Sequence, residues 1–153
     1  METPYYLTYM IHYSYSQFTK DVKSLEKDIR AYSPEAVVAI ARGGVTFGHF
    51  VSSLLDIRNF YTINSIHYND TKKLDDIHIF NIPDLERYDT VLLVDDIIDS
   101  GDTIEEVIKV LKAKYPKLQI KTATLFYKKT AKIEPDFSVN EATDWIEFFW
   151  EKF

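Results

Sequence analysis

Three carboxylates lie close together in the segment VLLVDDIIDSGDT, residues 91–103. Asp95 and Asp96 directly follow an aliphatic run, and Asp99 comes three residues later. Like charges at this spacing repel one another, so we expect a cation or a ligand rich in hydroxyl groups between them. Carboxylate oxygens bind Mg²⁺ and accept hydrogen bonds from sugar hydroxyls. The segment therefore predicts a binding site for a metal ion, a sugar or both.

The next four residues, Ser100, Gly101, Asp102 and Thr103, supply two hydroxyl groups and a small-residue turn ahead of a predicted helix. Unpaired amides and the helix dipole attract anions, and phosphate in particular, to such a helix amino terminus. The turn is not a Walker A loop, since no glycine run ends in Lys-Ser or Lys-Thr, and GxGxxG is also absent. A phosphate beside the turn and a diol beside the acids together describe a ribose 5-phosphate.

Two other interpretations of the acidic segment fit the sequence less well. Exposed acids can cap a following helix, but capping accounts for Asp99 or Asp102 and not for both acids at the strand end. The DDxxD motif of isoprenoid synthases binds magnesium and diphosphate from a helix of a large all-helical protein. Here the motif follows a strand-like run in a chain of 153 residues.

The periodicity of apolar residues predicts the elements that hold these groups. A short apolar run with β-branched residues indicates a buried strand at 36–41, and TVLLV indicates a central strand at 90–94. We also expect strands at 59–66 and at 119–127, where the sequence alternates. Apolar residues at helical spacing indicate helices over 18–32, from about 47 and from about 104. We expect a loop over 68–76 and a capping box between Thr103 and Glu106.

Strands that alternate with helices form a parallel sheet covered on both faces. Ligands of such sheets bind beyond the carboxyl ends of the strands. Asp95 and Arg42 each come just after a predicted strand, so the acids and the Arg42-Gly43-Gly44 turn should face one crevice. We find no internal repeat or linker, which predicts a single α/β domain over residues 1–153.

Composition narrows the class of protein. The apolar share of 46% and the charged share of 27% are typical of a soluble globular protein. A net charge of −6 argues against nucleic-acid binding, because phosphate contact needs a basic face. The chain has no cysteine, which excludes disulfides and thiol catalysis. We find neither a secretory signal nor an apolar stretch that could form an integral membrane segment, so we expect a cytoplasmic protein.

Several motifs together resemble the type I phosphoribosyltransferase family. VLLVDDIIDSGDT resembles that family's phosphoribosyl-pyrophosphate motif, and AIARGGVTFG resembles its pyrophosphate loop. TLFYKK and DWIEFFWE resemble the base-binding segments of the 6-oxopurine branch. The small size and the Trp-Ile-Glu tail are most similar to the bacterial xanthine-guanine-hypoxanthine phosphoribosyltransferases, and the resemblance spans roughly residues 12–150.

The resemblance implies a fold and an activity. The fold is α/β, a central parallel sheet flanked by helices, with a core over about 12–130 and a small hood from the chain termini, including about 131–153. The activity is purine salvage: Mg²⁺-dependent transfer of 5-phosphoribosyl from phosphoribosyl pyrophosphate to guanine, hypoxanthine or xanthine, giving GMP, IMP or XMP and pyrophosphate. The family is usually homodimeric or homotetrameric.

A regulator of the same fold is the alternative, binding phosphoribosyl pyrophosphate or RNA without salvage activity. Lys128 and the Trp145-Ile146 pair favour the enzyme. The acidic net charge disfavours RNA.

The resemblance also assigns roles to residues. The metal ligands are Asp96 and Asp95, which also hold the ribose hydroxyls. The catalytic residue is Asp99, the candidate base for the proton at purine N7. The implied phosphoribosyl-pyrophosphate-binding residues are Arg42, Gly43, Asp95, Asp96, Ile97, Ile98, Asp99, Ser100, Gly101, Asp102 and Thr103. The implied purine-binding residues are Asp99, Lys128, Trp145 and Ile146. A cis peptide is implied just before Arg42.

Two positions depart from the family pattern. His67-Tyr68 replaces the usual Ser-Tyr at the start of a mobile lid, expected over roughly 68–82. Asp102 replaces a common glycine and should add negative charge beside the phosphate turn. The four histidines show no metal-ligand spacing, and we interpret them as structural or surface residues. We expect Lys129 to be a surface residue and Phe148, Phe149 and Trp150 mainly to pack in the hood.

Overall fold

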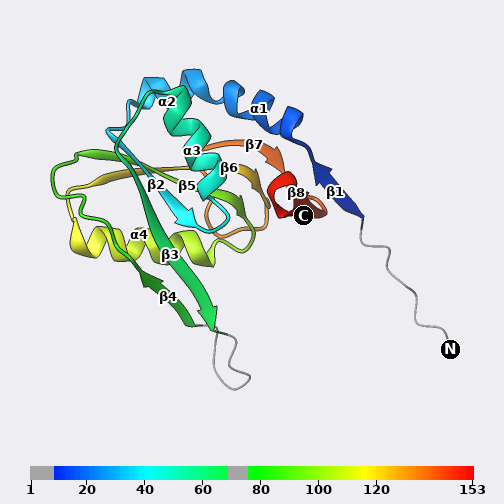
Figure 1. Cartoon of the computed structure of the whole chain (residues 1–153). Helices are drawn as coiled ribbons and strands as arrows, with labels where there is room; N and C mark the ends of the chain where they lie inside the picture. The colour runs from blue at the N-terminus through cyan, green and yellow to red at the C-terminus, as the bar shows by residue number, and fades with distance from the viewer. Residues whose placement is uncertain (1–8, 69–75) are drawn as a thin grey trace.

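A six-stranded sheet forms the centre of the molecule. The computed structural model describes residues 9–68 and 76–153 (Figure 1). The strands lie in the spatial order β4 (Asp76–Phe80), β3 (Phe60–Tyr68), β2 (Ala36–Ala41), β5 (Thr90–Ile98), β6 (Gln119–Tyr127) and β7 (Phe137–Glu141). Neighbouring strands are parallel, except that β3 and β4 pair antiparallel. The predicted α/β fold with a central, mostly parallel sheet is confirmed.

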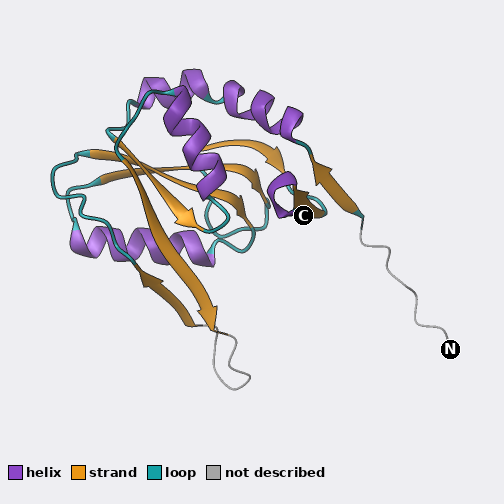
Figure 2. Ribbon diagram, in the orientation of Figure 1, coloured by secondary structure: helices purple, strands orange, loops and turns teal. Residues whose placement is uncertain are grey.

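Helices cover both faces of this sheet (Figure 1 and Figure 2). α1 (Tyr15–Ser24), α2 (Glu26–Tyr32) and α3 (Val45–Leu54) lie on one side, and α4 (Asp102–Lys114) lies on the other. Two apolar clusters fill the two interfaces. The first includes Phe18 and Phe47, and the second includes Val107 and Leu111 from α4.

The central strand β2 shows why continuous apolar runs predicted strands here. Alternate side chains of a strand point to opposite faces. Val37 and Ala39 accordingly join the cluster of α1 and α3, while Val38 and Ile40 join the cluster of α4. Because both faces are covered, every position of the strand except the last is buried, and its sequence shows no polar alternation.

The two chain ends form a small second sheet, which is the hood. β1 (Met10–Tyr13) pairs parallel with β8 (Trp145–Phe148), and the 3-10 turn η1 (Phe149–Glu151) follows. The ring of Tyr13 packs edge-on against Phe126 and Phe148, with centroids 4.9 and 5.8 Å away. The predicted hood from the termini is confirmed. β7, which lies within 131–153, extends the main sheet instead of joining the hood.

Two helix predictions are wrong in detail. The helix expected over 18–32 is two helices, α1 and α2, separated at Leu25. α1 begins earlier than expected because Ser14 caps it, with Oγ accepting a hydrogen bond from the Gln17 amide at 3.1 Å. The expected capping box of Thr103 and Glu106 does not begin α4, because the helix already includes Asp102. α4 begins at Asp102 after Gly101, which makes no side-chain cap bond.

Four strands were not predicted individually, namely β1, β4, β7 and β8. β4 falls at the end of the expected loop and inside the expected lid, where it pairs with β3. The rest of the expected loop, together with the matching part of the lid over 69–75, lies outside the described residues.

Candidate active site

The Arg42-Gly43-Gly44 turn joins β2 to α3 beside the acidic segment. The peptide bond between Ala41 and Arg42 is cis, as the resemblance implied. A Cβ atom on Gly43 would lie 2.5 Å from Oδ2 of Asp96, and one on Gly44 would lie 2.7 Å from the Val94 carbonyl oxygen. Glycine is required for this approach, which brings the two polar segments together at the carboxyl edge of the sheet. The Arg42 side chain itself is exposed.

Asp95 and Asp96 lie inside β5 and not after it. We expected the strand to end at Val94, but its pairing with β6 continues to Ile98, opposite Tyr127. The carboxylates accept hydrogen bonds from the strand's own amides. The Asp96 amide donates to Oδ1 of Asp95 at 2.9 Å, and the Ile97 amide donates to Oδ1 of Asp96 at 2.7 Å. The continued ladder thus fixes both acids on the sheet.

Burial raises the pKa of both carboxyl groups, and the nearby charge of Asp96 raises the pKa of Asp95 further, well above its usual range. Carboxylate oxygens are the ligands that Mg²⁺ takes, and a divalent cation would favour the ionised forms. The described residues hold no group of three or more acids, histidines or cysteines able to enclose a metal. Asp95 and Asp96 thus offer oxygen ligands of the type that Mg²⁺ takes.

A small cavity of about 200 Å³ lies at the turn between β5 and α4. It is lined by the predicted residues Asp95, Ile97, Ile98, Asp99, Ser100, Gly101 and Thr103, together with His67 and Ile104. Gly101 has a φ of +92°, a conformation that favours glycine. The first turn of α4 thus opens onto a cavity of a size suited to a phosphate group.

Asp102 does not line this small cavity, and a lysine side chain pairs with its carboxylate. Nζ of Lys132 lies 2.5 Å from Oδ1 of Asp102 and 3.1 Å from Oε2 of Glu105. The hydrogen bond from Lys132 lowers the pKa of Asp102, helped by one from Ser100. The negative charge that we expected here is therefore balanced by a cation from the loop after β6.

A larger cavity of about 450 Å³ lies between β5 and the hood. It is lined by the predicted residues Asp96, Ile97, Asp99, Lys128, Trp145 and Ile146, together with Thr143, Asp144, Phe148 and Glu151. Ile97 and Asp99 line both cavities, so the two adjoin. Trp145 is 66% exposed, which leaves its ring available to a ligand.

Lys128 and Asp99 form an ion pair in the larger cavity, with Nζ 2.6 Å from Oδ1. Lys128 directly follows β6, and its amide donates to the Ile98 carbonyl at 2.9 Å. This backbone bond holds the end of β6 beside the acidic segment. Lys129 points to a different partner, Glu141, at 3.3 Å, in keeping with its interpretation as a surface residue.

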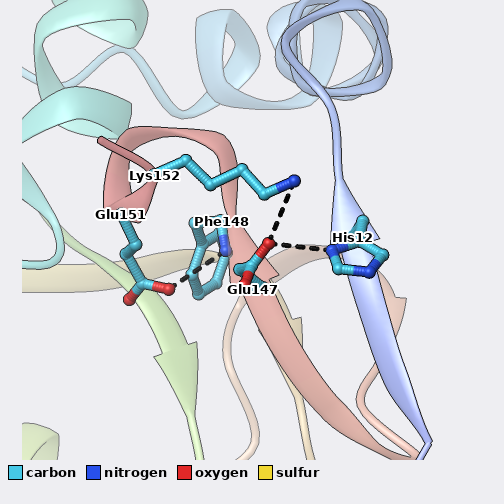
Figure 3. A network of polar contacts seen from close by, with 5 residues as sticks. All are labelled: His12, Glu147, Phe148, Glu151 and Lys152. Carbon is cyan, nitrogen blue, oxygen red and sulfur yellow. Dashed lines mark hydrogen bonds and ion pairs between the residues drawn. The ribbon is translucent and has the colours of Figure 1, made fainter.

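Glu151 lines the larger cavity although the sequence did not single it out. Its Oε2 accepts a hydrogen bond from the Phe148 amide at 3.1 Å (Figure 3). Its charge contributes to the raised pKa of Asp96, after the larger effect of burial. Glu147 points elsewhere, toward His12 at 2.8 Å and Lys152 at 3.4 Å (Figure 3). Pairing of β8 with β1 places Glu151, so no local motif signals it.

This is an α/β protein with the architecture expected of a phosphoribosyltransferase. The features that define it are the order of the strands in the sheet, the Arg42-Gly43-Gly44 turn and the pair of acids Asp95 and Asp96. The family model for the phosphoribosyl transferase domain matches residues 14–152, and the chain belongs to that family. Among the described residues, no helix is long and apolar enough to cross a membrane.

Three relatives illustrate the similarity. The xanthine-guanine phosphoribosyltransferase of Cereibacter sphaeroides is 31% identical over 150 residues, covering 92% of this chain and 86% of that protein. The Helicobacter pylori xanthine-guanine-hypoxanthine phosphoribosyltransferase structure has a TM-score of 0.87 and 42% identity, covering 94% of both chains. The purine phosphoribosyltransferase structure from Pyrococcus horikoshii has a TM-score of 0.82 and 31% identity, covering 94% of this chain and 95% of that one.

Proposed function

We propose that this chain is a Mg²⁺-dependent purine-salvage phosphoribosyltransferase. It transfers 5-phosphoribosyl from phosphoribosyl pyrophosphate to guanine, hypoxanthine or xanthine, and releases pyrophosphate. The main support is the pair of adjoining cavities that share Asp99, one at a helix amino terminus and one beside Lys128 and Trp145. The same activity is supported by the names of the Cereibacter and Helicobacter relatives and by their sequence identity to this chain.

The larger cavity suits a 6-oxopurine. A lysine ammonium only donates hydrogen bonds, so Lys128 pairs with a carbonyl O6 and opposes the amino group of adenine. The exposed ring of Trp145 stacks on the base, which contributes about 1 kcal/mol beyond area burial. The carbonyl of Ile146 accepts a hydrogen bond from the 2-amino group of guanine. These three contacts orient N9 toward the sugar.

Asp99 is the proposed base for the purine proton. It lines both cavities and therefore lies where base and sugar meet. Its carboxylate accepts or shares the proton at N7 as N9 attacks. Lys128, now 2.6 Å from Asp99, then shares its hydrogen bonds between this carboxylate and O6 of the base.

Asp95 and Asp96 hold the ribose hydroxyls, and their negative charge stabilises the oxocarbenium-like transition state. They are also the proposed ligands of Mg²⁺, which when bound neutralises charge on the leaving pyrophosphate. Backbone amides at Arg42 and Gly43 bind the pyrophosphate, since Gly43 has no side chain between its backbone and Asp96. Ser100 to Thr103 bind the 5′-phosphate.

Pyrophosphate release tests the proposal. The purified protein is incubated with Mg²⁺, phosphoribosyl pyrophosphate and each of guanine, hypoxanthine, xanthine and adenine. Release is expected with 6-oxopurines and not with adenine. No release with any 6-oxopurine would favour the alternative, a regulator of this fold without salvage activity.

The proposal extends to the state of the protein in the cell. We propose that the protein is a homodimer or homotetramer in the cytoplasm. The support is the family resemblance alone. Light scattering of the purified protein tests the oligomeric state, and a monomer mass would show that the proposed oligomer is wrong. Fluorescence microscopy of a tagged chain tests the location in the cell.

A further inference from the structure

The small cavity presents a charge problem for its proposed ligand. A phosphate monoester carries roughly −1.5 to −2 charges near neutral pH. The cavity is already lined by two acids, Asp95 and Asp99. The amino terminus of α4 offsets this only in part, with roughly half a positive charge. A basic or hydrogen-bond-donating side chain in the cavity would therefore favour a bound phosphate.

His67 is placed to supply that group. It lies near the end of β3 and lines the small cavity. Its Nε2 atom forms a 2.8 Å hydrogen bond with Oγ1 of Thr103, in the first turn of α4. The imidazole therefore already reaches the helix terminus where the phosphate is proposed to bind.

The nearby lysines have other partners. Lys128 pairs with Asp99, and Lys132 pairs with Asp102 and Glu105. Across 9–68 and 76–153, His67 is the one basic side chain that lines this cavity, and its recorded partner is a neutral hydroxyl. A histidine in this position can release Thr103 and turn to an anion without breaking an ion pair.

The other groups around His67 are mostly acidic or neutral. Asp102 lies in the first turn of α4. The hydrogen bond from Lys132 is the main cause of the lowered pKa of Asp102, and the imidazole of His67 makes a smaller contribution. From β5 and its turn come Asp95 and Asp99. On β4, the residue opposite His67 is the apolar Ile77. Among the described side chains that line the small cavity, the imidazole of His67 is the one that can donate an N–H group to a phosphate.

We propose that His67 binds the 5′-phosphate of phosphoribosyl pyrophosphate directly, a statement that rests on the function proposed above. Nε2–H donates to a phosphate oxygen, and the Thr103 hydroxyl, released from the histidine, donates to the same group. When it is protonated, His67 also adds a positive charge beside the carboxyl groups of Asp95 and Asp99. His67 is thus a binding residue for the donor substrate and not a residue that contacts the purine.

Three variants of the full-length protein test this role: His67→Ala, His67→Gln and, as a control, His49→Ala. His49 is an exposed histidine on α3 that lines neither cavity of the site. We expect His67→Ala to weaken binding of ribose 5-phosphate, measured by titration calorimetry, by about tenfold or more. The KM for phosphoribosyl pyrophosphate should rise similarly, and the KM for guanine should stay within about twofold. His49→Ala should leave all three unchanged.

The glutamine variant isolates the charge. The ratio of wild-type to His67→Gln affinity for ribose 5-phosphate should fall as pH rises from about 6 to about 8, because imidazoles lose their charge in that range. Titration of the ligand itself cancels in this ratio. A ratio that is constant with pH would overturn the charged role.

The outcomes separate this inference from the proposed function. A wild-type protein that neither binds ribose 5-phosphate nor releases pyrophosphate would overturn the function itself. An active wild type whose His67→Ala variant matches His49→Ala would overturn only the inference. Equal increases in the KM values for guanine and phosphoribosyl pyrophosphate would also overturn it, because they would indicate general damage to the site.

Discussion

At the residue scale, the acidic segment combines carboxyl groups in three different environments. Asp95 and Asp96 are held on the sheet with raised pKa values, and burial is the main cause. Asp99 is more exposed and pairs with Lys128. Asp102 faces Lys132. Since the first two pay the cost of burial without a cation from the protein, they are the ones suited to an external cation and to sugar hydroxyls.

Replacing Asp95 with asparagine should stabilise the ligand-free protein and remove its activity. The folded-state pKa of Asp95 lies above its unfolded value, so ionisation of this group destabilises the fold increasingly as pH rises through that interval. The amide carries no charge and keeps an oxygen for the Asp96 amide. At pH about 7.5 the variant should unfold a few degrees above wild type. The difference in unfolding temperature between the variant and wild type should disappear toward pH about 4. Below that pH, Asp95 is uncharged in both the folded and the unfolded protein.

Asp99→Asn is the matched control for this measurement. Asp99 is exposed, so its amide variant should show no such gain in unfolding temperature. A gain for Asp95→Asn that persists unchanged at low pH would show that charge is not its cause.

Lys128→Ala should damage recognition of the base more than recognition of the sugar. The substitution removes a charged donor to O6, and the loss of such a bond is typically about tenfold or more in affinity. We expect the KM for guanine to rise by that factor and the KM for phosphoribosyl pyrophosphate to change by less than about threefold. Lys129→Ala, next in the chain but paired with Glu141, is the control. Steady-state kinetics with each substrate varied would show equal losses if the base-reading role is wrong.

At the element scale, the sequence predicted four strands of the central sheet. Three of them, β2, β5 and β6, are buried over much of their length because helices cover both sides. β4 and β7 lie at the two edges of the sheet, and β8 pairs with a strand more than a hundred residues away. Their short, mixed sequences carry little local signal. Sequence also placed the end of β5 too early, because the ladder with β6 continues through the acids.

The same distinction applies to the site. Asp95 to Thr103 form one local segment, so their types and spacing were readable in the sequence. His67 reaches the small cavity from the end of β3, and Glu151 reaches the larger cavity from η1. Their positions depend on the hydrogen bond to Thr103 and on the pairing of β8 with β1. The sequence marked His67 only as a departure from a family pattern, and it gave no signal for Glu151.

Gly43→Ala should disturb the pyrophosphate turn specifically. The added methyl group would lie 2.5 Å from Oδ2 of Asp96, so the turn or the carboxylate must move. We expect the KM for phosphoribosyl pyrophosphate to rise by about tenfold or more, since binding geometry tolerates shifts of about 1 Å poorly. The unfolding temperature should change little, because the clash is with one polar side chain at the open edge of the sheet.

Gly48→Ala provides the comparison for the same chemical change. Its methyl group would lie 2.9 Å from both Cβ of Ala39 and the ring of Phe60, inside the core. This variant should lose stability and keep its KM values. If the two alanine variants behaved alike in thermal unfolding and kinetics, the specific role of Gly43 would be wrong.

At the scale of the whole molecule, the larger cavity exists only because the two chain ends meet. Trp145, Ile146 and Phe148 belong to β8, which is held by β1. Tyr13 of β1 donates from its hydroxyl to Oδ2 of Asp21 at 2.6 Å, and Asn140 donates to the same oxygen at 2.9 Å. One buried carboxylate thus ties the hood, α1 and β7 together. The proposed purine contacts depend on this connection.

Tyr13→Phe should loosen the hood while preserving its apolar packing. Burial and the Asp21 carboxylate raise the pKa of Tyr13, so its hydroxyl stays protonated and donates at working pH. Without it, Asp21 loses one of two donors in a buried place, which costs about 1–3 kcal/mol and lowers the unfolding temperature by several degrees. Because Tyr13 packs against Phe148, which lines the larger cavity, the KM for guanine should rise more than that for phosphoribosyl pyrophosphate. Tyr9→Phe, at a 72% exposed tyrosine, should match wild type in both calorimetry and kinetics. A Tyr13→Phe protein of lower stability with both KM values unchanged would show that the carboxylate supports the fold without positioning the base cavity.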